Sequence, residues 1–244
     1  NDDRSDRNLY TRSPTFKDIT ANIYYLYTNS SIDNLIAIGK YAAKYIIGCN
    51  NTAIGREALK GSASTTSNAK YNTAIGSTSM TDITTGRNNT AVGSASLHWI
   101  TTGSYNTGTG KDALAYLTTG CYNTAIGYQC IRGSSGNYIT GCYNVALGYE
   151  ALYHLTSGCN NVAIGRESMK GDNTNKVTGS FNIGIGWASL GSLTSGTGNT
   201  GIGYNTLYSN TTGCDNIAIG ISAMFNNEGG CRNVAIGRES VKKN

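Results

Sequence analysis

The feature that most constrains this chain is a short repeated motif, Asn-(Thr/Val/Ile)-(Ala/Gly)-(Ile/Val/Leu/Thr)-Gly. Its Asn stands at positions 51, 72, 89, 106, 123, 144, 161, 182, 199, 216 and 233. Seven of the ten steps between these positions are 17 residues long and three are 21. A fixed period of this length is typical of solenoids, in which each repeat forms one coil and neighbouring coils stack. The spacing therefore predicts an all-β fold, a β-solenoid or parallel β-roll of about 11–12 coils.

The three longer steps each add four residues at a comparable place in the coil, in segments 61–70, 131–141 and 171–179. Insertions of this kind are expected to form loops. A degenerate copy of the motif, Asn34 to Gly39, carries one extra residue before its Gly and is interpreted as the first coil. The predicted organisation is an N-terminal arm, cap or shaft connector in residues 1–33, followed by a solenoid domain in residues 34–244.

Within the motif, larger residues alternate with Ala or Gly, which is typical of a short strand with two different faces. An apolar residue four positions after the motif Gly, such as Leu97 or Met169, predicts a second short strand or bend. Thr-Thr-Gly segments predict tight turns, because Gly tolerates positive φ. The larger residues, as in Val162, Ile164 and Met169, are expected to form the core, and the Ala/Gly face is expected to lie outside.

A core with three apolar side chains per coil is thin and marginal for an isolated chain. A bare Ala/Gly face would let three such coils approach closely around an axis. The pattern therefore favours a homotrimer, with a wide monomeric solenoid as the alternative. Because an open solenoid end exposes unpaired strand edges, further fibre, virion or cell-surface proteins are expected as partners at both ends.

Composition argues against several classes of function. Charged residues make up 14% of the chain and the net charge is +5, without a dense basic stripe, so no nucleic-acid partner is expected. No apolar stretch approaches the length of a membrane span, so no membrane insertion is expected. His98 and His154 are out of register with one another, so they form neither a catalytic triad nor a metal-ligand set.

Acidic residues recur two positions after the motif Gly, and Glu150 and Glu167 lie on successive coils. Two neighbouring carboxylates could suggest a glycosidase. However, the preceding residue is often basic, as at Arg166, which is more typical of an exposed polar edge. The chain is therefore predicted to be no enzyme, with no catalytic residues, no metal site and no cofactor.

Six of the seven cysteines fall two residues before the motif Asn: Cys49, Cys121, Cys142, Cys159, Cys214 and Cys231. Other coils place Ser, Thr, Lys or Arg there, so Cys is interpreted as a substitute for Ser. The runs Cys121, Cys142, Cys159 and Cys214, Cys231 predict a ladder of stacked free thiols or of disulfides between coils or chains. A metal site is not expected, because one residue per coil gives no tetrahedral cluster. Cys130 is predicted to be buried.

Aromatic residues also recur in register. Tyr128, Tyr149, Trp187 and Tyr204 directly follow the motif Gly. A ladder of rings can stabilise a solenoid by stacking alone. Exposed tyrosines among Asn, Ser and Thr can equally bind glycans or proteins, so these four residues are the candidate binding site.

The repeats resemble two groups of known proteins. Asn161 to Gly165 and Asn233 to Gly237 resemble the head repeats of YadA-type trimeric autotransporter adhesins. The segments 203–213 and 148–153 resemble more closely the Asn-Thr-Ala-Ile-Gly repeat arrays of phage and viral tail-fibre-like proteins. The resemblance covers residues 34–244 and implies a trimeric parallel β-roll that binds host matrix or cells. The longer coil of this chain favours the fibre over the bacterial adhesin.

These observations lead to a hypothesis of function. The chain is expected to be a non-enzymatic structural and adhesive fibre or spike protein on a virion surface, or on an extracellular or cell surface, that contacts a host glycan or protein receptor. One alternative is an ice-binding solenoid. It is weakened because the Thr after the motif Asn becomes Val or Ile in five of eleven coils, which would suit a core position. The other alternative is an inert spacer within a larger fibre.

Overall fold

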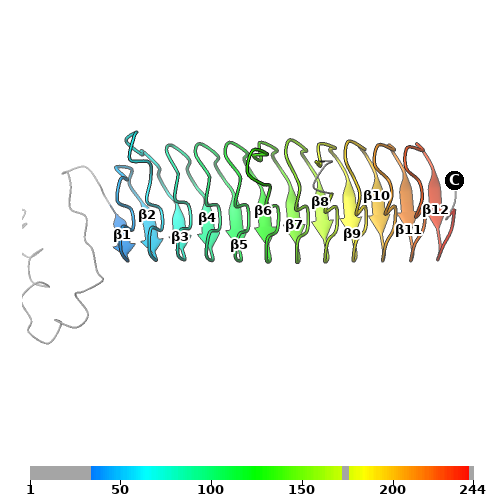
Figure 1. Cartoon of the computed structure of the whole chain (residues 1–244), viewed down its shortest axis with the longest axis horizontal. Helices are drawn as coiled ribbons and strands as arrows, with labels where there is room; N and C mark the ends of the chain where they lie inside the picture. Colours follow the sequence, from blue (N-terminus) through cyan, green and yellow to red (C-terminus); the bar gives the residue numbers. More distant parts are fainter. Residues whose placement is uncertain (1–33, 172–175, 242–244) are drawn as a thin grey trace, which may run out of the picture.

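The computed structural model describes residues 34–171 and 176–241. The regular structure in these two ranges is one twelve-stranded parallel sheet, whose strands follow one another in sequence order along a straight rod (Figure 1). The strands are β1 (Leu35–Ile38), β2 (Asn51–Ile54), β3 (Thr73–Ile75), β4 (Thr90–Val92), β5 (Thr107–Thr109), β6 (Thr124–Ile126), β7 (Val145–Leu147), β8 (Val162–Ile164), β9 (Ile183–Ile185), β10 (Thr200–Ile202), β11 (Ile217–Ile219) and β12 (Val234–Ile236). The predicted β-solenoid is confirmed, with about twelve turns.

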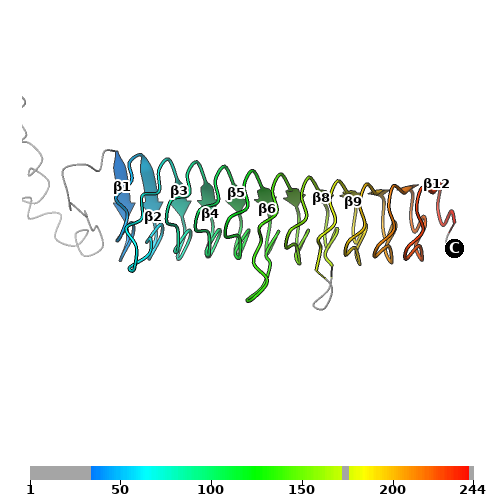
Figure 2. The ribbon, with the colours of Figure 1, turned by 90° about the horizontal axis from the view of Figure 1, so that it is seen from above.

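Every strand pairs with the next at the same motif position, as in Thr124 opposite Val145 and Ala125 opposite Ala146. The insertion between β6 and β7, residues 131–141, extends beyond the other turns on the side away from the sheet (Figure 2). The prediction of a coil of constant length, with inserted residues forming loops, is therefore confirmed for residues 131–141. Residues 1–33, predicted to be an arm, cap or connector, lie outside the described residues.

The two faces of each strand are the reverse of the sequence-based expectation. Ala53, Ala125 and Ala163 are fully buried, whereas the neighbouring Thr124 and Ile126 are partly exposed. Space inside the coil explains the reversal. A Cβ atom at Gly108 would lie 2.6 Å from Ser96 Oγ, so at this point even a methyl group would force Ser96 to move and a larger side chain would not fit. The predicted Ala/Gly outer face, and the trimer contact built on it, are therefore wrong.

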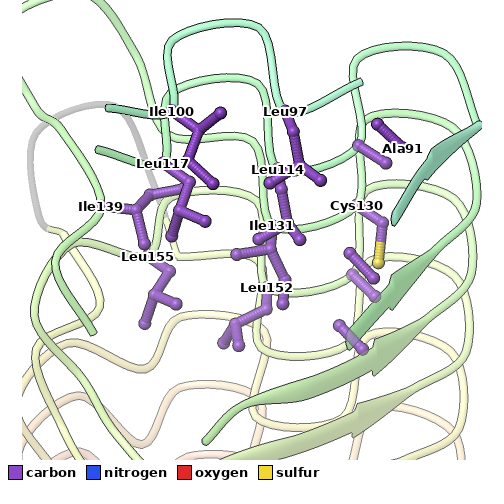
Figure 3. Close-up of a cluster of buried hydrophobic side chains, with 14 of the residues drawn as sticks. Ala91, Leu97, Ile100, Leu114, Leu117, Cys130, Ile131, Ile139, Leu152 and Leu155 are labelled. Carbon is purple, nitrogen blue, oxygen red and sulfur yellow. The ribbon is translucent and has the colours of Figure 1, made fainter. Parts of the chain in front are cut away.

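The interior is filled by columns of side chains that run along the rod (Figure 3). One column holds the residue four positions after the motif Gly, for example Leu97 and Leu114. A second column, which the sequence analysis missed, lies in the last turn of the coil and comprises Ile83, Ile100, Leu117, Ile139, Leu155, Val177 and Leu193. The strand Ala residues line the remaining wall. This arrangement gives each chain a core of its own.

Of the short strand or bend predicted after the motif Gly, the described residues show the bend. It is a turn in which the second and fourth residues after the motif Gly have positive φ, such as Gln129 at 52° and Ile131 at 49°. Positive φ is uncommon for residues other than Gly and unfavourable for a β-branched one. The conformation is held by hydrogen bonds to both neighbouring coils: the Gln129 N–H donates to Lys111 O and the Ile131 N–H to Ala151 O.

The motif Asn is buried from Asn51 to Asn216 and links each coil to the next. Asn123 is representative: its backbone N–H and Nδ2 donate to Asn106 Oδ1 at 2.9 and 3.1 Å, and Nδ2 also donates to Gly141 O at 2.9 Å. Its own Oδ1 accepts the corresponding two bonds from Asn144. Buried polar groups must be paired in this way to avoid a desolvation cost. The motif Asn thus forms a continuous ladder that fixes the register of the coils.

The reversed faces lead to a prediction. Replacing Ala125 with Val adds two methyl groups to a closed interior, and overpacking of this kind costs about 1–3 kcal/mol. Replacing Thr124 with Val changes the outer face, where Val145 already occupies the same column, and is expected to be near neutral. Urea denaturation followed by circular dichroism should show a lower unfolding midpoint only for Ala125→Val. The opposite order would restore the face assignment expected from the sequence.

Candidate functional site

The largest candidate surface is the outer face of the sheet, defined here by the two outward-pointing residues of each strand. The first column comprises Ile36, Thr52, Thr73, Thr90, Thr107, Thr124, Val145, Val162, Ile183, Thr200, Ile217 and Val234. The second comprises Ile38, Ile54, Ile75, Val92, Thr109, Ile126, Leu147, Ile164, Ile185, Ile202, Ile219 and Ile236. None of these side chains is charged, and most are aliphatic.

Many of these aliphatic side chains are well exposed, from 36% for Val92 and Ile202 to 69% for Ile236 at β12. With strands about 4.8 Å apart, twelve strands give a continuous apolar face on the order of 50 Å long. Soluble monomers rarely expose a contiguous apolar patch larger than a few hundred Å². The outer face is therefore suited to contact with another surface.

The four predicted binding residues form one column that runs past the C-terminal ends of the strands, directly after the motif Gly. The rings of Tyr128 and Tyr149 stack with centroids 5.4 Å apart, and those of Trp187 and Tyr204 meet at 5.2 Å. The Arg166 guanidinium joins the two pairs, lying 5.6 Å from the centroid of Tyr149 and 5.1 Å from that of Trp187. We refer to Tyr128, Tyr149, Arg166, Trp187 and Tyr204 as the aromatic column. The structure thus brings all four predicted residues together.

The rings in the aromatic column lie against one another or against Arg166, so much of each ring face is already occupied. Each of these four aromatic residues still keeps between 40% (Tyr128) and 48% (Trp187) of its surface accessible. A side-chain hydrogen bond with Glu150 raises the pKa of the Tyr149 hydroxyl above its usual value. The column can therefore offer hydrogen bonds and positive charge more readily than flat stacking platforms.

A second stack of rings consists of residues that precede the motif Asn. Tyr105, Tyr122 and Tyr143 stack almost perfectly parallel, with centroids 4.8 and 4.9 Å apart and interplanar angles of 1° and 2°. The spacing is that of the coils themselves, so stacking here needs no ligand. Desolvation, followed by the neighbouring phenols, raises the pKa of Tyr122. The sequence analysis interpreted such ladders as structural or binding, and this geometry favours the structural role.

The in-register cysteines are organised by hydrogen bonds between coils. Cys142 Sγ accepts the N–H of Cys121 at 3.1 Å, and Cys159 Sγ accepts the N–H of Cys142 at 3.2 Å. Ser180 Oγ accepts the N–H of Cys159 in the same way at 3.0 Å. Cys and Ser are therefore equivalent acceptors at this position, which agrees with the substitution inferred from the sequence. All seven thiols are free in the structure.

Cys130 differs from the other cysteines because it faces the interior. It is fully buried next to the strand Ala residues (Figure 3). Burial raises the pKa of its thiol to about 12. A thiol in this environment stays protonated and inert, which fits the packing role predicted for it.

The paired carboxylates lie in an ion-pair network. Lys170 Nζ is 2.7 Å from Glu150 and 3.7 Å from Glu167. Burial would raise the pKa of Glu150, but hydrogen bonds from Lys170 and Tyr149 outweigh it and hold the pKa below its usual value. A glycosidase acid needs the opposite shift. The arrangement favours the polar-edge interpretation of these two residues.

Nowhere in residues 34–171 and 176–241 do three His, Cys, Asp or Glu side chains converge on a point where a metal ion could sit. The same ranges contain no helix with the length and hydrophobicity of a membrane span. His98 Nδ1 lies 3.1 Å from Thr78 O, so this ring is anchored to the backbone.

Comparison of the chain with protein-family models, with curated proteins and with solved structures gives no match.

Proposed function

We propose that this chain is a non-enzymatic structural and adhesive fibre protein, in which three copies associate in parallel through their outer faces. The outer face carries the proposal: twelve strands of uncharged, mostly aliphatic side chains lie exposed on one flat surface. Burying such a surface against another copy removes apolar area from water, which is the main favourable term in association. A rod of this kind would be displayed on a virion surface, or on an extracellular or cell surface.

The two columns of the outer face differ, and this difference favours a ring over a pair. The second column is aliphatic in every strand except at Thr109, whereas the first contains Thr in half of the strands. In a closed ring each chain presents one side of its face to one neighbour and the other side to the next. The aliphatic column then lies near the axis and the Thr-containing column nearer the rim. The resemblance to trimeric head repeats also favours three chains.

The oligomeric state tests this proposal. Light scattering at micromolar concentration should give three times the chain mass of 25.7 kDa. Substituting Ile126→Lys together with Ile164→Lys places charges in the middle of the face, outside the chain's own core, and should shift the mass to that of one chain. Burying unpaired ammonium groups in a trimer is costly, whereas a monomer leaves them in water.

Tyr138→Lys is the control, because Tyr138 is exposed on the inserted loop that extends away from the sheet. It should leave the mass unchanged, and circular dichroism should show intact strands in all variants. A wild-type protein that sediments as a monomer would contradict the association. A dimer would contradict the three-fold arrangement.

In this proposal the aromatic column, which runs past the C-terminal ends of the strands, mediates adhesion. Three parallel copies would repeat this column around the rod, so that weak contacts to a host glycan or protein receptor add up. Arg166 and the phenol hydroxyl groups supply the charge and hydrogen bonds for such contacts. In this proposal further fibre or surface proteins cover the two open ends of the solenoid.

A glycan array and cell-binding assays test the adhesive part. Tyr149→Ala and Trp187→Ala should reduce binding about tenfold or more, since each removes a ring that positions Arg166. Phe181 is exposed and directly precedes a motif Asn, as Tyr105, Tyr122 and Tyr143 do, so it lies outside the aromatic column. Phe181→Ala should therefore leave binding unchanged. Equal binding by all variants would reduce the aromatic column to a structural element, and the protein to the spacer considered from sequence.

An ice-binding function is the second candidate, and one observation favours it. The Thr after the motif Asn points outward and not into the core, and five consecutive coils carry it: Thr52, Thr73, Thr90, Thr107 and Thr124. The position after the motif Asn, which was expected from the sequence to lie in the core, therefore lies on the outer face, so this expectation is wrong. The adjacent column is still largely Ile and Val, which suits a protein partner better. We expect purified protein to show no thermal hysteresis, and a clear hysteresis would support ice binding in place of the fibre.

A further inference from the structure

We propose that the two runs of in-register cysteines bind a soft monovalent cation, such as Cu(I) or Ag(I), between the sulfur atoms of neighbouring coils. The first run is Cys121, Cys142 and Cys159, and the second is Cys214 and Cys231. This proposal concerns the edge of the coil and does not depend on the fibre function.

The sulfur atoms of each run are held in single file. Each Sγ accepts a backbone N–H from the preceding coil, as Cys142 does from Cys121 at 3.1 Å and Cys231 from Cys214 at 3.1 Å. Each thiol also points toward the carbonyl oxygen two residues earlier, with Sγ···O distances between 3.4 and 3.7 Å. The same two contacts in every coil give the side chains the same orientation. Equivalent sulfur atoms therefore repeat at about the coil spacing of 4.8 Å.

This geometry suits a linear, two-coordinate metal. A cation midway between two such sulfur atoms would have one thiolate on either side, an arrangement that soft d¹⁰ cations with a single charge readily adopt. Soft thiolate ligands favour Cu(I), Zn(II) and iron–sulfur clusters. Zn(II), by contrast, requires four ligands around it, and the column supplies only two at any point. The lack of three converging ligands among the described residues is consistent with a two-coordinate site.

Metal binding requires the thiolate form, and the N–H groups that point at sulfur stabilise negative charge there. The cysteines differ in this respect. A hydrogen bond from Thr197 Oγ1 at 3.6 Å is the largest of the contributions that lower the pKa of the Cys214 thiol, whereas burial is the main cause that raises the pKa of the Cys142 thiol. Binding one Cu(I) between two cysteines forms two Cu–S bonds and releases two protons to solvent, with no change in oxidation state.

A disulfide fits the column less well. The cysteines lie in the turns before the strands, where in-register side chains of stacked coils keep their Cβ atoms about as far apart as their Cα atoms, near the strand spacing of about 4.8 Å. A disulfide brings the two Cβ atoms to roughly 3.5–4.5 Å, so neighbouring coils would have to distort. A bridging cation needs no such approach.

The chain contains its own control for this proposal. Cys49 occupies the same register position, but the next coil has Lys70 there, so Cys49 has no sulfur partner. Cys130 is buried and its raised pKa of about 12 opposes metal binding. Ser occupies the same position in two coils, at Ser104 and Ser180. A Cys→Ser substitution is therefore expected to keep the hydrogen bond and the fold.

The experiment is a Cu(I) titration of the reduced, full chain without oxygen, in competition with a chromogenic Cu(I) chelator, with metal content measured by native mass spectrometry. Cys142→Ser removes the shared member of the first run, and Cys231→Ser removes the second pair. The double variant should lose at least tenfold in affinity and most of the bound metal. Cys49→Ser and Cys130→Ala should bind as the wild type does. X-ray absorption should show two sulfur ligands per copper.

Circular dichroism verifies that each variant is folded. Equal Cu(I) binding by the double variant and the wild type would overturn the proposal, as would an equal loss in Cys49→Ser. Alkylation of the purified chain before reduction, followed by mass measurement, should find free thiols in both runs. Disulfides between Cys121, Cys142 and Cys159, or between Cys214 and Cys231, would assign these columns to covalent cross-linking and contradict the metal site.

Discussion

The stack of coils depends on the buried Asn ladder. From Asn72 to Asn216, each motif Asn donates to its counterpart in the preceding coil and to a Gly carbonyl, and accepts two bonds from the counterpart that follows, as Asn123 does between Asn106 and Asn144. A buried amide left unpaired would cost several kcal/mol, so a coil that slipped by one residue would lose this pairing throughout. Because the coils are aligned residue by residue, each of the remaining motif positions also forms a column of its own along the rod.

Columns explain how so simple a repeat acquires surface chemistry. A residue type that recurs at one position of the coil is multiplied along the rod at the coil spacing, whether it is Ile on the outer face, Tyr beside the sheet or Cys at the turn. Tyr105, Tyr122 and Tyr143 illustrate the result, since their parallel rings follow from the register of the coils alone. The same logic underlies the proposed contact face, the aromatic column and the proposed cation sites.

Which residues of each strand face inward decides which surface is left for association with a partner. With Ala inside and Ile outside, each chain has a complete small core, and its largest apolar surface is free for a partner. Association is then proposed to bury bulky aliphatic side chains, which contribute more free energy than a face of Ala and Gly would. The outward Thr residues also keep ice binding open to experiment.

The sequence by itself determined the coil, its register, the positions of the loops and the columns of Cys and aromatic residues, because all of these follow from the period of the repeat. It could not decide which side of Thr124-Ala125-Ile126 faces inward, because alternation has the same period in either orientation. It identified the position of Ile131 as a strand or bend but did not reveal its positive φ, and it did not reveal the core column of Ile100 and Leu117, which lies outside the five-residue motif. The tertiary structure decided these points, because the width of the coil interior, set by the approach of opposite walls, leaves room for Ala and excludes Ile.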